Sequence, residues 1–187
     1  MKPTTMTKAI AAAVLVLSIP AAAVAQEENP FLRLSVAELA QTWLLRDCGI
    51  EDEPLLEAAV VQHAAELTPI FRTAWEEGPP ERLVAETRQQ ARNRFARNQA
   101  ALRDPESLGL SPEDAERAST RTAEEFVARS VQSLETGYRT QALRGLFLTA
   151  GDEGRALVEQ VARQEEESAL ADAARLLLEE GVAGTPE

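Results

Sequence analysis

Apolar residues recur at helical spacing along most of this chain, and no segment alternates apolar and polar residues in the two-residue period of a strand. Of the 187 residues, 44% are hydrophobic but only 4% are aromatic, and alanine, leucine, glutamate and arginine are abundant. These residue types favour helices, whereas strands are enriched in β-branched and aromatic residues. The sequence therefore predicts an all-α, single-domain protein, folded as a bundle or as an irregular array of helices.

Helix-start and helix-stop signals divide the chain into segments. Ser35 with Glu38 has the pattern of a capping box, residues 78–80 (Gly-Pro-Pro) break a helix, and residues 111–112 (Ser-Pro) begin another. These signals predict five to six helices, because one long segment contains glycines at which it could be interrupted. The predicted segments are 35–49, 54–78, 81–103, 111–150 (with Gly137 and Gly145 inside it) and 153–180, the last stopped by Gly181.

The domain boundaries follow from the same signals. We expect one helical domain over residues 35–181. An acidic leader over residues 26–34 is expected to be ordered only in part, and residues 182–187 are expected to form a frayed tail.

Helical spacing also predicts which face of each segment is buried. In the segment 81–103, Val84 and Phe95 belong to a narrow seam, and in the segment 54–78 Pro69 lies opposite the apolar stripe. The stripe of the segment 54–78 consists of Leu56, Val60, Ala64, Leu67, Ile70, Phe71, Ala74 and Trp75. The stripe of the segment 153–180 consists of Val158, Val161, Ala162, Ala169, Ala173 and Leu176.

Residues 1–25 have the features of a Sec-type secretory signal peptide. Lys2 and Lys8 make a positive start, and residues 9–19 form an apolar stretch too short to span a bilayer. The Ala-Val-Ala sequence that ends at Ala25 fits a cleavage site. We therefore expect a periplasmic or secreted protein with no membrane span after cleavage. An N-terminal anchor that stays uncut is the alternative.

The counts of reactive residues exclude several kinds of chemistry. One Cys and one His cannot build a Cys/His zinc site, an iron–sulfur cluster or an internal disulfide framework, and we expect no metal and no cofactor. The net charge of −12 argues against a nucleic-acid partner, because phosphate binding requires a dense cationic surface.

Neither the cysteine nor the histidine is placed for catalysis. Cys48 follows Asp47 at the predicted end of a helix, where the helix dipole and the carboxylate both disfavour a thiolate. Cys48 is expected to be a small, partly buried residue, or else to form an intermolecular disulfide. His63 lies at the edge of an apolar stripe, which is typical of a hydrogen-bonded residue near the core.

Two carboxylates fall on the apolar stripe of the segment 153–180. Glu165 lies in the middle of this stripe, and Asp172 follows one heptad later, close to the same face. A carboxylate inside a packed seam must be paired or protonated, and such groups can act as acids, so both are catalytic candidates. The alternatives are a solvated stretch at residues 165–167 and a structural ion pair with an arginine of the segment 81–103.

The segment 81–103 has the sharpest local contrast in charge, with six arginines and two glutamates in an otherwise acidic chain. One interpretation is a cationic surface for acidic or unfolded partners, since arginine supplies both charge and stacking. The other, which the sequence favours slightly, is that the acidic flanking segments neutralise these arginines internally. The residues assigned to binding are Arg88, Arg92, Arg94, Arg97 and Arg103.

Together these features favour a non-enzymatic, exported helical protein, chaperone-like or envelope-associated, that binds a protein or another acidic envelope partner through the segment 81–103. One alternative is a carboxylate-dependent hydrolase, acting for example on cell-wall glycans, in which Glu165 works with a second carboxylate. Another is a structural homo-oligomer, formed through Cys48 or through the alanine-rich helix faces.

Overall fold

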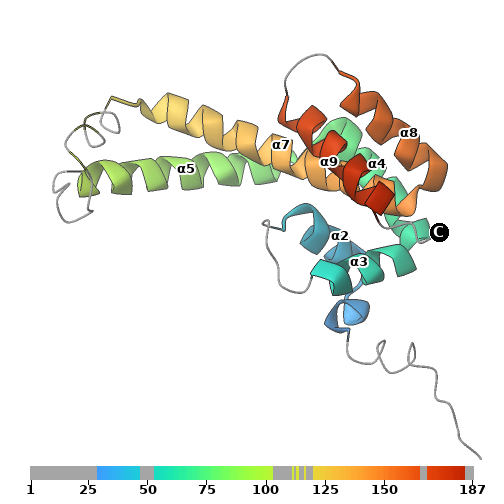
Figure 1. Ribbon diagram of the computed structural model, residues 1–187. Helices are drawn as coiled ribbons and strands as arrows, with labels where there is room; N and C mark the ends of the chain where they lie inside the picture. Colours follow the sequence, from blue (N-terminus) through green and yellow to red (C-terminus); the bar gives the residue numbers. More distant parts are fainter. Residues whose placement is uncertain are drawn as a thin grey trace, which may run out of the picture.

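A computed structural model describes residues 29–46, 53–102, 120–164 and 168–183, together with positions 111, 113 and 116. These residues form seven α-helices and a short 3-10 helix, η1, and they contain no strand, which confirms the all-α prediction (Figure 1). The predicted range of five to six helices is therefore too low. The elements are η1 (Pro30–Arg33), α2 (Val36–Leu44), α3 (Glu53–Gln62), α4 (Ala64–Glu77), α5 (Glu81–Ala101), α7 (Ala123–Thr149), α8 (Gly151–Ala162) and α9 (Ala169–Ala183).

The part of the predicted leader that the structure describes, residues 29–34, packs against the core, and residues 26–28 lie outside the described residues. The side-chain amide of Asn29 donates a 2.8 Å hydrogen bond to the carbonyl oxygen of Leu55 in α3, and Asn29 is 5% exposed. Phe31 and Leu34 pack against the buried residues of the core. These contacts are with residues distant in the sequence, so a local pattern could not reveal them.

The capping box at the start of α2 is confirmed. The hydroxyl of Ser35 accepts a hydrogen bond from the backbone N–H of Glu38, and the Glu38 carboxylate accepts one of 2.9 Å from the backbone N–H of Ser35. The Ser35 hydroxyl also donates to that carboxylate, at 2.7 Å. These hydrogen bonds satisfy donors that the first turn of a helix leaves without partners.

The predicted segment 54–78 folds as two helices, because α3 ends at Gln62 and His63 is the N-cap of α4. Most of the predicted stripe is buried across both helices, and Pro69 is exposed, as predicted. The buried members of the stripe are Leu56, Val60, Leu67, Phe71 and Ala74.

Helix α7 is the centre of the molecule, and it packs against α2, α3, α4, α5, α8 and α9. It is continuous through Gly137 and Gly145, so neither glycine interrupts it. On one side, Leu146 joins a cluster from α2, α3 and α4 that includes Trp43 and Phe71. On the other side, Leu143 joins a cluster from α8 and α9.

The start of α7 differs from the prediction. Instead of one helix from residue 111, the structure has non-helical residues at 121–122 and a helix that begins at Ala123. The cap is Thr122, whose hydroxyl accepts from the backbone N–H of Glu125 while the Glu125 carboxylate accepts from the backbone N–H of Thr122. Thr122 and Glu125 have the spacing of a capping box, so the sequence does contain a local signal for this helix start.

The last predicted segment is also two helices, because α8 ends at Ala162 and α9 begins at Ala169. Because α9 does not continue the helical phase of α8, the two helices bury different faces from those of one continuous helix. The predicted stripe is correct in α8, where Val158 and Val161 are buried, and wrong in α9. Leu176 is 58% exposed, and Ala169 is also exposed. The residues of α9 that enter the core are Ala171, Ala174 and Leu177. Helix α9 also continues past Gly181 to Ala183.

Helix α5 and the N-terminal half of α7 lie side by side and project away from the other helices (Figure 1). We call this pair of helices the arm. The predicted helix over residues 81–103 is confirmed as α5, and Val84 and Ala91 are the residues of α5 that are buried against α7. Among the described helices, none is both long enough and apolar enough to cross a membrane.

Candidate functional site

The arginines of α5 are exposed on the arm. Arg82 pairs with Glu86 of the same helix at 2.8 Å. The others make no ion pair with any residue that the structure describes, so the internal neutralisation considered for them does not occur within these residues. These exposed arginines are Arg88, Arg92, Arg94 and Arg97.

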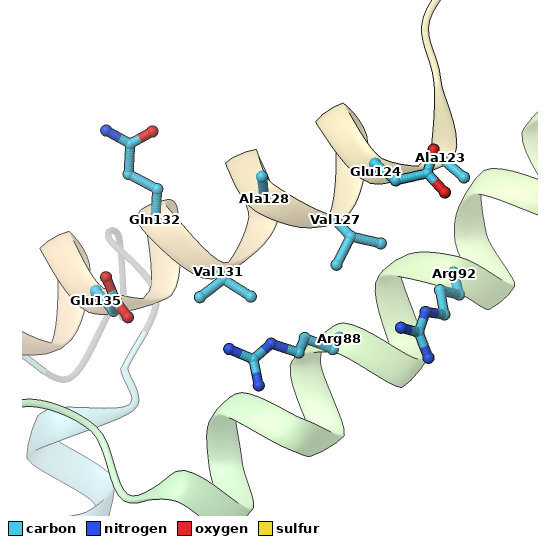
Figure 2. A pocket seen from close by; sticks show the side chains of 9 residues that line it. All are labelled: Arg88, Arg92, Ala123, Glu124, Val127, Ala128, Val131, Gln132 and Glu135. Carbon is cyan, nitrogen blue, oxygen red and sulfur yellow. The ribbon is translucent and has the colours of Figure 1, made fainter.

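A groove of about 470 Å³ runs along one side of the arm, between α5 and α7. Figure 2 shows Val127 and Val131 pointing from α7 toward α5, with Arg88 and Arg92 along the α5 rim. The α7 rim carries two carboxylates, Glu124 and Glu135, and neither pairs with a described residue. Its remaining lining residues are Ala123, Ala128 and Gln132. This groove thus has an apolar floor between a cationic rim and an anionic rim, and we call it the balanced groove.

A second hollow of about 710 Å³ is lined by Thr87 and Arg94 of α5, by Arg121 and by residues of α7 that include Arg129. Its carboxylate is Glu125, which already accepts a 3.1 Å hydrogen bond from the backbone N–H of Thr122. This hydrogen bond, followed by the contact with the Thr122 hydroxyl, lowers the pKa of Glu125 and keeps it ionised. Three arginines and one carboxylate make this hollow cationic, and we call it the cationic hollow.

The apolar seam of the arm is covered less completely than the body of the protein. The rings of Phe95 and Phe126 meet at a centroid distance of 5.8 Å, but both residues stay partly exposed. Val127 and Val131 are likewise only partly buried, whereas Leu143 in the same helix is fully buried. Among the described residues, α5 and α7 are the two helices of the arm, and two helices leave part of each apolar face open to solvent, because burying a face requires neighbours on both of its sides.

A polar network in the body was not found by sequence reasoning. Arg46, whose side chain is 3% exposed, lies 3.9 Å over the ring of Trp43 and approaches Glu53 of α3 at 3.2 Å. Arg144 of α7 pairs with Glu53 at 2.9 Å and with Glu57 at 2.7 Å. The only signal in the sequence was the spacing of the two glutamates, one helical turn apart. These ion pairs connect α3 to α7 and to Arg46, which follows α2.

Of the two catalytic candidates, the structure describes only Asp172. Asp172 is exposed and pairs with Arg175 at 2.7 Å, so its predicted place near an apolar face is wrong, because the break before α9 changes the helical phase. Glu165 lies outside the described residues, as do Arg103, Cys48 and the residues of the predicted signal peptide.

His63 lies partly buried at the junction of α3 and α4, and its Nδ1 is 3.4 Å from a carboxylate oxygen of Glu66. In the part of the chain that the structure describes, no three side chains of the His, Cys, Asp or Glu type gather in a way that could hold a metal ion.

Comparisons with protein-family models, with curated proteins and with solved structures find no match for this chain. A proposal of function therefore depends on the geometry and the charge of the arm.

Proposed function

We propose that this protein is an exported, non-enzymatic binding protein that engages an acidic partner through its arm. The observation that carries the proposal is that Arg88, Arg92, Arg94 and Arg97 of α5 are exposed and form no ion pair with a residue that the structure describes, although the chain is acidic. A guanidinium group is always charged, binds carboxylates through two parallel hydrogen bonds and stacks on flat groups. Such a surface fits a protein partner that is rich in aspartate and glutamate.

The cationic hollow is the preferred place for that partner. Arg94 from α5 and Arg129 from α7 line it together, and Arg97 lies one turn from Arg94 on α5. Arg88 and Arg92, in contrast, line a groove that also carries Glu124, so their surface attracts an acidic partner less strongly. The electrostatic attraction between these arginines and an acidic partner acts over a long range. It is therefore expected to raise the rate of association more than the lifetime of the complex.

Fluorescence anisotropy with a labelled peptide of alternating Asp and Glu tests the proposal, with a Lys-rich peptide of equal length as the control ligand. The double variant Arg94→Glu, Arg129→Glu is expected to weaken binding of the acidic peptide by about tenfold or more. The matched control is Arg155→Glu, Arg163→Glu, which changes the net charge equally outside the arm, since Arg155 lies in α8 and Arg163 is the C-cap residue of that helix.

Two outcomes would contradict the proposal. One is that the wild-type protein does not bind the acidic peptide at low ionic strength. The other is that both double variants weaken binding equally, which would mean that only the net charge matters. The chaperone-like version further predicts that the protein suppresses aggregation of an unfolded client, and that Arg94→Glu, Arg129→Glu reduces this effect. Export predicts that protein recovered from the cell envelope begins at Gln26, which mass spectrometry can check.

A further inference from the structure

We propose that the balanced groove is a self-association surface, in which the arms of two copies of this chain pack face to face as a four-helix bundle. The inference does not depend on the acidic partner proposed above, because its charged residues are Arg88, Arg92, Glu124 and Glu135. None of these four lines the cationic hollow, although Ala128 and Gln132 line both the groove and the hollow.

The first argument is the incomplete burial of α7. Its C-terminal half is enclosed by α4, α8 and α9 as well as by α2 and α3. Its N-terminal half has α5 beside it, so Val127 and Val131 stay partly exposed on the floor of the balanced groove. A second pair of helices would cover this floor, and bundles of four helices are the usual way in which such faces become buried. Ala123 and Ala128 in the lining leave room for a close approach.

The second argument is the arrangement of charge, which identifies the occupant. Arg88 and Arg92 lie along the α5 rim, and Figure 2 shows Glu124 and Glu135 toward the two ends of the α7 rim. An acidic partner would be repelled by one rim of this groove, and a basic partner would be repelled by the other. A second copy of this chain avoids this repulsion. A two-fold axis parallel to the arm places the cationic α5 rim of each copy against the anionic α7 rim of the other.

Such a pairing also suits the helix directions. Helices α5 and α7 run antiparallel within one arm, since the chain reverses direction between them (Figure 1). With the two-fold axis along the arm, α5 of one copy lies over α7 of the other and is antiparallel to it as well. Every neighbouring pair in the bundle is then antiparallel, so the helix dipoles attract one another. The four charged groups on each groove, which have no ion pair with a described residue, would gain partners.

Analytical ultracentrifugation of the purified protein at low ionic strength tests the inference through charge reversal. The variant Arg88→Glu, Arg92→Glu makes both rims acidic, and the variant Glu124→Arg, Glu135→Arg makes both rims basic. Each variant alone is expected to dimerise at least about tenfold more weakly than the wild type. Mixed in equal amounts, the two variants are expected to form a heterodimer, because acidic rims then face basic rims on both sides.

The control is Arg94→Glu, Arg129→Glu in the cationic hollow, which is expected to leave dimerisation unchanged. A wild-type protein that stays monomeric at every concentration would overturn the inference, as would a mixture of folded variants that forms no heterodimer. If a double variant loses helicity by circular dichroism, the single reversals Arg92→Glu and Glu124→Arg replace it. Binding of the acidic peptide by the monomeric variant separates failure of this inference from failure of the proposed function.

Discussion

The indole N–H of Trp43 donates a 2.7 Å hydrogen bond to the backbone carbonyl oxygen of Gln141, a residue 98 positions away. This hydrogen bond joins α2 to the middle of α7 inside the core, where Trp43 is fully buried and Gln141 is 9% exposed. The side chain of Gln141 accepts a second hydrogen bond, of 2.9 Å, from Nε of Arg46. The two interactions connect the N-terminal part of the body to the helix that continues into the arm.

Replacing Trp43 with phenylalanine is expected to destabilise the protein by about 2 kcal/mol, because the hydrogen bond is lost and a small cavity forms. Urea denaturation followed by circular dichroism measures this loss. Trp75→Phe is the control, since Trp75 is only partly buried. A loss for Trp43→Phe no greater than that for Trp75→Phe would mean that the hydrogen bond contributes little.

The two glycines inside α7 are expected to respond oppositely to alanine. A Cβ at Gly145 would lie 2.5 Å from Cδ2 of the fully buried Phe71, so Gly145→Ala is expected to destabilise the protein by about 1–3 kcal/mol. A Cβ at Gly137 would meet nothing within 4 Å, so Gly137→Ala is expected to stabilise the helix by about 0.5–1 kcal/mol.

Differential scanning calorimetry of the two glycine variants gives the comparison. Melting temperatures that change in the same direction would contradict the close packing of α7 against Phe71. The additional variant Phe71→Leu makes room for the new methyl group, so the losses from Gly145→Ala and Phe71→Leu are expected to sum to more than the loss in the double variant.

The partly buried ion pairs of Arg144 are expected to matter more than ion pairs at the surface. Arg144→Met leaves Glu53 and Glu57 without this partner and is expected to cost about 1–3 kcal/mol of the free energy of unfolding. Arg72→Met removes an exposed pair with Glu153 and is expected to cost less than about 1 kcal/mol. Equal losses in urea denaturation would indicate that solvent screens the Arg144 network fully.

The two capping boxes predict different responses of carboxyl pKa values to mutation. In Glu38 the hydrogen bond with the Ser35 side chain is the larger cause that lowers the pKa below the ordinary 4.5, whereas in Glu125 the backbone N–H of Thr122 is the larger cause. Ser35→Ala removes the larger cause and is therefore expected to raise the pKa of Glu38 toward 4.5, while the hydrogen bond from the backbone N–H of residue 35 still lowers it. Thr122→Ala is expected to raise the pKa of Glu125 only in part. Carbon-detected NMR titration of the carboxyl groups measures both.

These capping boxes also set the sign of a pH dependence. Because both carboxyl groups have a lowered pKa in the folded protein, their stabilising effect is complete above the ordinary value of 4.5. It is lost as the pH falls through the lowered values, since a protonated carboxyl group accepts these hydrogen bonds less well. Stability of the double variant Ser35→Ala, Thr122→Ala is expected to depend less on pH in this acidic range than that of the wild type.

Local patterns were enough to predict most of the helices and part of the core. The capping box at Ser35, the apolar stripe through Leu67 and Phe71, and the arginine-rich helix α5 all depend on residues within a few turns of one another. Predictions of the buried face were wrong where they assumed that one helix continues over a long segment. The prediction that Asp172 and Leu176 lie on a buried face assumes one continuous helix, whereas α8 ends at Ala162 and a separate helix, α9, begins at Ala169. When a helix ends and a new one begins a few residues later, the side chains of the second helix no longer point in the directions that one continuous helix would give them.

The sequence by itself determined the helical class, the capping box at Ser35 and the contrast between an acidic chain and a basic helix, because these properties follow from residue type and short-range spacing. Only the tertiary structure decided that α5 lies beside α7 in the arm, and that Arg94 and Arg97 are exposed and form no ion pair with a residue that the structure describes. The physical reason is that whether a charge is neutralised depends on which distant segments pack beside it. Only long-range contacts, such as that between Trp43 and Gln141, establish this packing.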